Sequence, residues 1–252
     1  MGHLIVELHE GWGCLTINRP PALNALNTAV LGDLAARLGE LAVRKDIRAV
    51  IITGAEGNFA AGADIGEIEG KGSAEGAADP RKGHWAAIRA FPKPLIAAID
   101  GFALGGGFEL ALMADLIVLG DSARVGLPET NLGIIPGAGG CQRLMALVGR
   151  ARAARMVLTG EIIDADQATE WGIASFRAPG SALPSAEAIA ATIAARAPLA
   201  LIAAKSVLIE GSEGALALSA ERSAFEALLD TADKAEGIRA FREKRKPEFW
   251  GE

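Results

Sequence analysis

The chain of 252 residues contains only two cysteines, Cys14 and Cys141, which lie far apart in the sequence. A disulfide framework is therefore excluded, and we expect a reducing compartment. Long hydrophobic runs are also missing, because the apolar stretches before Asp100 and Asp115 end at those residues, so no membrane-spanning segment is expected. The first residues lack the features of a signal or transit peptide, which favours a cytoplasmic protein.

Histidine is equally scarce, and several common catalytic motifs do not occur. His3, His9 and His84 are too scattered for a zinc site, and there is no HExxH or CxxC. Neither GxSxG nor GxxxxGK[ST] is present, which removes the main support for a nucleophile-elbow hydrolase or a P-loop enzyme. The glycine runs at 105–107 and 137–140 do not fit GxGxxG. We therefore expect no metal and no dinucleotide cofactor.

The composition is that of a globular protein, with 50% hydrophobic residues. Acidic side chains number 31 against 25 lysines and arginines, and the resulting net charge of −6 opposes binding to nucleic acid. The length fits one α/β domain with a large core.

Strand and helix patterns alternate in the first part of the chain. A hairpin is predicted from Ile5–His9 and Cys14–Asn18 around a turn at 10–13, and a helix starts at Asn27 or Thr28. The apolar residues of this helix that share one face are Val30, Leu31, Leu34, Leu38 and Leu41. Buried strands are predicted over 49–53, 95–99 and 116–119. A helix is predicted over 85–91, and another follows the glycines at 105–107 and ends near Ala114. This alternation indicates an α/β fold.

The sequence beyond Gly137 has mostly helical patterns. Helices are predicted over 138–148, 152–159, 185–196, 199–210, 215–229 and 234–244. A break at Ala178-Pro179-Gly180-Ser181 divides a core of residues 1–180 from a helical C-terminal region of residues 181–252.

Two glutamates, Glu109 and Glu129, each lie beside a glycine-rich turn. Two carboxylates at one site can divide general acid and general base catalysis. Glu109 stands among apolar residues, so a buried helix would desolvate its carboxylate; an acid stabilised by the helix dipole is the alternative interpretation. For Glu129, a surface loop acid is the commoner interpretation.

Five segments together resemble the crotonase superfamily, the enoyl-CoA hydratase/isomerase family, nearly from end to end. They are Asn18-Arg19-Pro20 to Leu26, Phe59-Ala60-Ala61-Gly62-Ala63-Asp64-Ile65, Asp100-Gly101 to Asp115, Leu127-Pro128-Glu129 to Arg143, and Phe241-Arg242-Glu243-Lys244-Arg245. The resemblance implies a spiral of ββα units whose helical C-terminal region covers the site. It also implies a homo-oligomer, either a trimer or a dimer of trimers.

The resemblance further implies a reaction and the residues that perform it. The backbone N–H groups of Ala63 and Gly106 would form an oxyanion hole for the thioester carbonyl of an acyl-CoA. Glu109 would activate a water that adds to C3 of a trans-2-enoyl-CoA, and Glu129 would transfer a proton at C2. The product is a 3-hydroxyacyl-CoA, as in fatty-acid β-oxidation, with CoA as part of the substrate and no further cofactor.

Substrate-binding residues follow from the same resemblance. Those expected to contact the substrate are Arg19, Ala61, Asp64, Ile65, Phe241 and Lys244, and those expected along the acyl pocket are Trp85, Phe108, Leu127 and Ile134. Core packing explains each of the acyl-pocket residues equally well. Two lysines that are common in the family are replaced here by Pro21 and Gly66, so charge compensation for CoA must come from other residues. Arg19 is one candidate, and the resemblance implies that Phe241 and Lys244 can reach the CoA of a neighbouring subunit.

Other functions remain open. Isomerisation of a Δ3-enoyl-CoA to the Δ2 form needs only one carboxylate, and hydrolases or C–C lyases of the family use the same oxyanion hole. A different class is RNA binding, which some relatives show, but the net charge of −6 opposes it.

Overall fold

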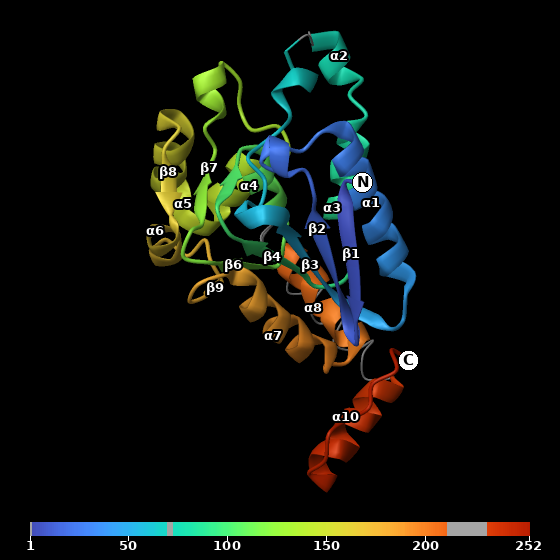
Figure 1. Ribbon diagram of the computed structural model, residues 1–252. Helices are drawn as coiled ribbons and strands as arrows, with labels where there is room; N and C mark the ends of the chain where they lie inside the picture. The colour runs from blue at the N-terminus through green and yellow to red at the C-terminus, as the bar shows by residue number, and fades with distance from the viewer. Residues whose placement is uncertain (1, 70–72, 211–230) are drawn as a thin grey trace.

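A six-stranded sheet forms the centre of the structure, a computed structural model that describes residues 2–69, 73–210 and 231–252 (Figure 1). The strand order is β1-β2-β3-β4-β6-β9, and all neighbours are parallel except the hairpin of β1 and β2. The strands are β1 (Leu4–His9), β2 (Gly11–Ile17), β3 (Ile47–Gly54), β4 (Leu95–Ile99), β6 (Leu116–Leu119) and β9 (Phe176–Arg177). The hairpin turn is tighter than predicted, because Trp12 and Gly13 belong to β2.

A second, three-stranded sheet was not predicted. It consists of β5 (Phe102–Leu104), β7 (Arg124–Gly126) and β8 (Ile162–Asp164). The chain passes from a strand of the first sheet to a strand of the second and then into a helix, as in β4–β5–α4 and β6–β7–α5. These helices are α4 (Gly106–Ala111) and α5 (Gly140–Thr159). The arrangement confirms the predicted α/β class with successive ββα units.

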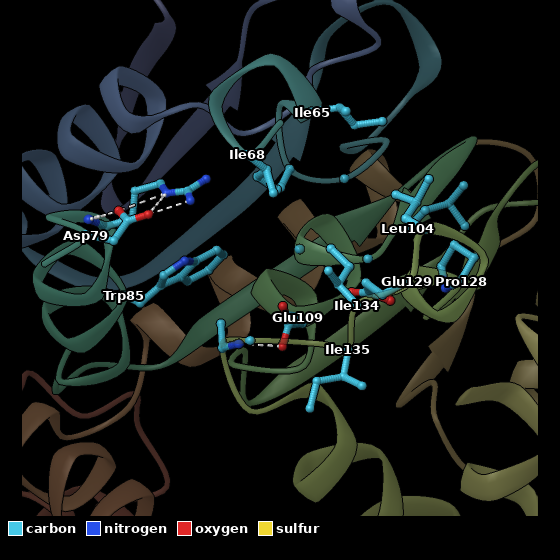
Figure 2. Close-up of a pocket in the computed structure, with 18 of the residues that line it drawn as sticks. Ile65, Ile68, Asp79, Trp85, Leu104, Glu109, Pro128, Glu129, Ile134 and Ile135 are labelled. Carbon is cyan, nitrogen blue, oxygen red and sulfur yellow. Dashed lines mark hydrogen bonds and ion pairs between the residues drawn. The ribbon is translucent and has the colours of Figure 1, made fainter. Parts of the chain in front are cut away.

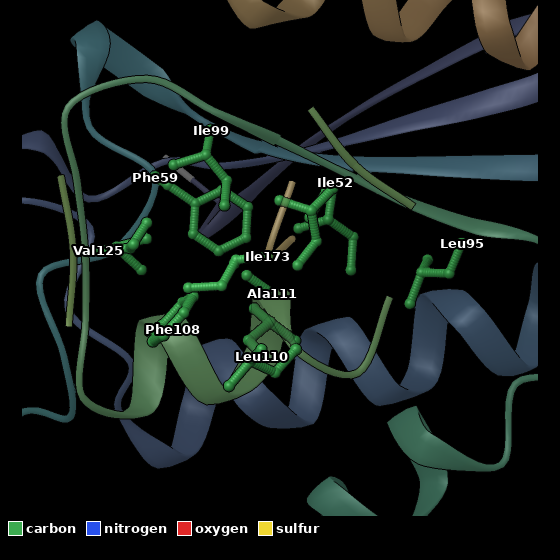
Figure 3. Close-up of a cluster of buried hydrophobic side chains, with 14 of the residues drawn as sticks. Ile52, Phe59, Leu95, Ile99, Phe108, Leu110, Ala111, Val125 and Ile173 are labelled. Atoms are coloured by element: carbon green, nitrogen blue, oxygen red, sulfur yellow. The ribbon is translucent and has the colours of Figure 1, made fainter. Parts of the chain in front are cut away.

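The larger core lies on the side of the first sheet that is covered by α1, α3 and α4. Helix α1 (Thr28–Val43) begins where predicted, because the Asn27 side chain accepts a hydrogen bond from the Val30 N–H at 2.9 Å. All five apolar residues predicted for one face of this helix are buried. Figure 3 shows Phe108 of α4 packed into this core near Phe59 and Ile99.

A second core lies on the opposite face of the sheet, under α7 (Ala182–Ala194). Ala182, Ala186 and Ala190, one helical turn apart, are fully buried against strand residues that include Ile51 and Ile96. Helix α7, the first helix after residue 180, therefore forms a layer that covers the second core. The division into 1–180 and 181–252 remains a prediction.

The other helices connect and surround these layers. They are α2 (Ser73–Ala77), α3 (Arg81–Arg89), α6 (Ala165–Glu170), α8 (Pro198–Glu210), α10 (Ala232–Glu243) and the short 3₁₀ helices η1 (Pro20–Ala22), η2 (Ala55–Gly57), η3 (Ile65–Glu67) and η4 (Glu129–Leu132). Helix α5 comprises the two helices predicted here, which meet at a kink at Gly149, where φ is 77°. The predicted helix over 215–229 lies outside the described residues.

In the described part of the chain, no single helix is long and apolar enough to cross a membrane. Helices α7 and α8 pass that test only as a pair, and they are bent by 114° relative to each other.

Candidate active site

A pocket of about 370 Å³ lies where β5, α4 and η4 meet the segment that follows β3 (Figure 2). The residues Ala61–Ala63 enter from that segment, and Leu104–Gly106 enter from the end of β5. Glu109 and Glu129, which are 20 residues apart in sequence, both line this pocket. The fold thus brings together the two carboxylates and the two glycine-rich segments that the sequence singled out.

The protein backbone holds the carboxyl group of Glu109 in place. It lies in α4 and is only 4% exposed. Its Oε1 accepts hydrogen bonds from the N–H groups of Ala138 at 2.7 Å and Gly140 at 2.9 Å. Two such donors satisfy the charge on Oε1 and orient the group, and Oε2 is left for a reacting molecule.

Glu129 occupies a different environment at the first position of η4. Its Oε2 is buried and has no hydrogen-bond partner among the described residues. Burial raises the pKa of Glu129 from 4.5 to about 7; a hydrogen bond from its own backbone lowers the pKa, and the charge of Glu109 raises it. A carboxyl group with this pKa carries a proton for much of the time near neutral pH, so it can act as an acid.

Two backbone N–H groups at the pocket wall can stabilise negative charge on a ligand by donating hydrogen bonds to it. A Cβ atom on Gly106 would lie 3.5 Å from the Ala63 nitrogen, so the two backbone segments approach closely. Gly106 is the first residue of α4, where helix geometry leaves the N–H without a partner in the helix. Among the described residues, neither the Ala63 nor the Gly106 N–H makes a hydrogen bond. The positive end of α4 adds to this electrostatic preference for an anion.

Glycine is required beside these donors. Gly105 has φ 49° and ψ −126°, a conformation that side chains disfavour. A Cβ on Gly107 would lie 2.1 Å from the Ala60 carbonyl oxygen. The triple glycine therefore lets the start of α4 pack against the segment that carries Ala63.

Comparison with known proteins agrees with this geometry. The family described as Enoyl-CoA hydratase/isomerase matches residues 7–252. The chain belongs to the enoyl-CoA hydratase/isomerase family. A 2,3-dehydroadipyl-CoA hydratase from Escherichia coli is 47% identical over 254 residues, covering 100% of both chains. A probable enoyl-CoA hydratase from Rhizobium meliloti is 42% identical over 98% of this chain and 97% of its own.

Solved structures of the family share the fold. An enoyl-CoA hydratase subunit from Geobacillus kaustophilus matches with a TM-score of 0.95 and 35% identity, covering 99% of this chain and 98% of its own. The enoyl-CoA hydratase from Bacillus anthracis matches with a TM-score of 0.94 and 37% identity, covering 99% and 100%. The predicted crotonase-type fold is thereby confirmed, and the chain is an enzyme of the hydratase/isomerase type with a pocket suited to acyl-CoA thioesters.

The four residues predicted along the acyl pocket lie in two different places. Trp85 and Ile134 line the pocket, together with Ile68, Leu132 and Ile135, which the sequence did not single out. Phe108 and Leu127 are instead fully buried in the core and do not line the pocket. Every residue of α4 is buried, so the apolar character of Phe108 alone does not tell whether it faces the pocket. Contact of Phe108 and Leu127 with the acyl chain stays a prediction.

Of the residues predicted to contact the CoA part, Ala61 and Ile65 line the pocket. Arg19 and Asp64 do not line it; they form an ion pair with 3.1 Å between Nη2 and Oδ2. Arg19 also donates to the Ala25 carbonyl at 2.6 Å. Their contact with CoA stays a prediction. The ion pair connects the segment that carries Ala63 with the segment that follows β2.

The C-terminal residues lie far from the pocket of their own chain (Figure 1). Lys244 is exposed and follows the end of α10 with φ 53°. Phe241 lies in α10, and its side chain is outside the described part of the structure. A role of either residue in binding the substrate of a neighbouring subunit stays a prediction.

No group of three or more His, Cys, Asp or Glu side chains that could hold a metal ion occurs within residues 2–69, 73–210 and 231–252. The residues that line the pocket include the charged Asp79, Arg81 and Lys82. Figure 2 shows Asp79 on the same side of the pocket as Trp85. Arg81 forms an ion pair with Asp79 and lies 3.9 Å from Glu67. This polar side of the pocket was not predicted.

Proposed function

We propose that the chain hydrates trans-2-enoyl-CoA thioesters to 3-hydroxyacyl-CoA. The observation that supports this proposal is the difference in environment between two carboxyl groups in one pocket. Glu109 accepts two backbone hydrogen bonds on Oε1, whereas Glu129 has a buried oxygen without a partner and a pKa raised to about 7. One group is suited to accept a proton and the other to donate one.

In this mechanism Glu109 acts as the base. Its Oε2 accepts a proton from a water molecule while the water oxygen forms a bond to C3 of the substrate. The π electrons of the C2–C3 double bond move toward the thioester carbonyl, whose oxygen becomes negatively charged. The N–H groups of Ala63 and Gly106 are the proposed donors to that oxygen, and preorganised donors of this kind contribute several kcal/mol.

Glu129 then completes the addition as the acid. Its proton is transferred to C2 as the electron pair returns from the enolate oxygen. The pair of carboxyl groups ends with one proton, now on Glu109, and exchange with water restores the starting state. The reaction as proposed consumes only water and the enoyl thioester, so it requires no metal and no redox cofactor.

The hydration of a defined substrate tests the proposal. Purified protein is mixed with crotonyl-CoA, and the loss of the enoyl-thioester absorbance is followed without any redox partner. Mass spectrometry should then find a product heavier by one water. An isomerase would instead produce the Δ2-enoyl thioester from a Δ3 substrate, with no change in mass, and this outcome would contradict hydration as the main activity.

For the acyl chain we propose a substrate that ends in a carboxylate. The Escherichia coli relative is named for 2,3-dehydroadipyl-CoA, and Lys82 is a cation of the pocket wall beside Arg81, which is paired with Asp79. Rates with dehydroadipyl-CoA and crotonyl-CoA should be compared for the wild type and Lys82→Ala. We expect kcat/KM to fall for the dicarboxylic substrate only; equal losses for both would contradict this choice.

A further inference from the structure

A half-buried arginine lies behind the turn that holds Glu109. Arg143 belongs to the first turn of α5, and its Nη1 donates a hydrogen bond to the Ala138 carbonyl at 2.8 Å. Its backbone N–H donates to the Gly139 carbonyl at 3.1 Å. In the described part of the structure, the Arg143 guanidinium forms no ion pair with a carboxylate. Among the residues that the structure describes, its guanidinium donates a hydrogen bond only to the backbone of this turn.

The turn itself is an anion-binding arrangement of backbone groups. The N–H groups of Ala138 and Gly140 converge on Oε1 of Glu109, and Gly139 between them has φ 95°, in the left-handed region. Arg143 holds the carbonyl of the peptide that lies between those two donors. The Ala138 carbonyl binds Arg143, whereas the N–H groups of Ala138 and Gly140 bind Glu109. The hydrogen bond to Arg143 therefore fixes the peptide orientation in which both N–H groups point at Glu109.

The space around the turn supports the same interpretation. A Cβ atom on Gly139 would lie 2.4 Å from Nη1 of Arg143, and a Cβ atom on Gly140 would lie 2.9 Å from Cγ of Glu109. Neither position accepts a side chain without a shift of its neighbour. The guanidinium and the carboxylate therefore each pack directly against the backbone of the turn.

The electrostatic environment of Arg143 also connects it to Glu109. Burial lowers the pKa of Arg143, the neighbouring Arg89 lowers it further, and the carboxylate of Glu109 raises it. Burial of a cation without a carboxylate partner costs free energy. The attraction to Glu109 offsets part of that cost.

We propose that Arg143 is a positioning residue for hydration, which holds the Ala138–Gly140 turn so that Glu109 points at the reacting water. The inference rests on the proposed function, because it assigns Glu109 a role in the reaction. Arg143 does not itself contact the substrate in this proposal, so its removal should affect kcat and leave KM nearly unchanged.

A double-mutant cycle tests this. Arg143→Ala, Arg143→Lys and Glu109→Gln are made singly, Arg143→Ala is combined with Glu109→Gln, and Arg150→Ala on the exposed side of α5 is the control. Arg143→Ala should lower kcat by about 10- to 100-fold, since small misplacements of catalytic groups have effects of this size. Arg143→Lys keeps a charged donor and should recover most of the rate.

In the Glu109→Gln background, Arg143→Ala should cause little further loss, because both changes act through the same carboxylate. Losses that multiply in the double variant, or a kcat of Arg143→Ala equal to that of Arg150→Ala, would overturn the proposal. Thermal unfolding identifies a variant that fails to fold, and Arg143→Met, which keeps an unbranched side chain but has no N–H donor, then replaces Arg143→Ala in the cycle.

A structural measurement separates this inference from the proposed function. If the wild type does not hydrate enoyl-CoA, the proposed function fails, and crystal structures of the wild type and Arg143→Ala then decide the role of Arg143. Unchanged hydrogen bonds from Ala138 and Gly140 to Glu109 in the variant would overturn it. Loss of these bonds would support it.

Discussion

A Cβ atom on Gly105 would lie 3.2 Å from Oε1 of Glu129, so the backbone of one residue packs directly against the carboxyl group of the other. Because Gly105 has no side chain, η4 can approach the start of α4 closely enough to bury the Glu129 carboxyl group. This approach leaves little room for water around Oε2, which agrees with the pKa of about 7. A carboxyl group at this distance from the triple glycine also lies beside the proposed oxyanion hole.

We expect the hydration rate to fall as the pH rises through about 7. The pKa of Glu129 is raised by burial, so the protonated acid predominates below this pH and the ionised form above it. Only the protonated form can donate to C2. The measurement is kcat as a function of pH, with circular dichroism at each pH to verify the fold. A constant kcat on both sides of neutrality would contradict the assignment of Glu129 as the acid.

Glu109→Gln and Glu129→Gln should each lower kcat by at least ~10²-fold, because positioned acid and base groups contribute about 10²- to 10⁴-fold. Substrate binding should change little, since an amide has nearly the shape of a carboxyl group. Glu170→Gln, an exposed acid in α6, is the matched control and should have the wild-type rate. Near wild-type hydration by both active-site variants would exclude the two-glutamate mechanism.

Gly106 allows the oxyanion hole to be tested at a position where the helix accepts proline. It is the first residue of α4, and proline is tolerated there because this N–H has no partner within the helix. Gly106→Pro removes the proposed donor and should lower kcat by about 10²-fold or more.

Gly106→Ala is the control for that experiment. It keeps the N–H, and its Cβ atom would lie 3.5 Å from the Ala63 nitrogen, an ordinary contact distance. The alanine variant should therefore lose much less activity than the proline variant. A folded Gly106→Pro protein that hydrates as fast as Gly106→Ala would eliminate this N–H as the donor.

Lys244→Ala tests whether the C-terminus binds CoA across subunits. Loss of a phosphate contact weakens binding of substrate and transition state alike, so KM should rise with kcat nearly unchanged. The difference should shrink with a pantetheine thioester, which lacks the nucleotide, and at salt concentrations where the Debye length falls below ~8 Å. Lys246→Ala, also exposed, is the control. An unchanged KM for the full CoA substrate at low salt would show that Lys244 contacts solvent and not CoA.

The sequence predicted those helices and strands that show a long pattern of apolar residues within one continuous segment. The β4 and β6 strands are unbroken apolar runs, and α1 combines an Asn27 cap with a regular apolar face, so their positions agree with the structure. The strands of the second sheet have three residues each, which is too short for a periodic signal. They form because ladder partners far apart in sequence pair with them, as Phe102 does with Arg124.

The site was predicted unevenly for a similar reason. Glu109 and Glu129 are visible as acids in unusual surroundings, and both line the pocket. The turn that holds Glu109 acts through backbone N–H groups of Ala138 and Gly140, and residue type does not reveal the direction of a backbone donor. The glycine run at 137–140 is the feature of the sequence that marks this turn.

The alanine face of α7 sets an order of events during synthesis. Strands β3 and β6, which carry Ile51 and Val118, are synthesised long before α7 leaves the ribosome. The buried alanines of α7 extend to Ala190. Until then one face of the central sheet lacks its cover, and exposed apolar strands of this kind favour aggregation. A nascent chain halted after β9 is therefore expected to need a chaperone, and release of α7 should end that need.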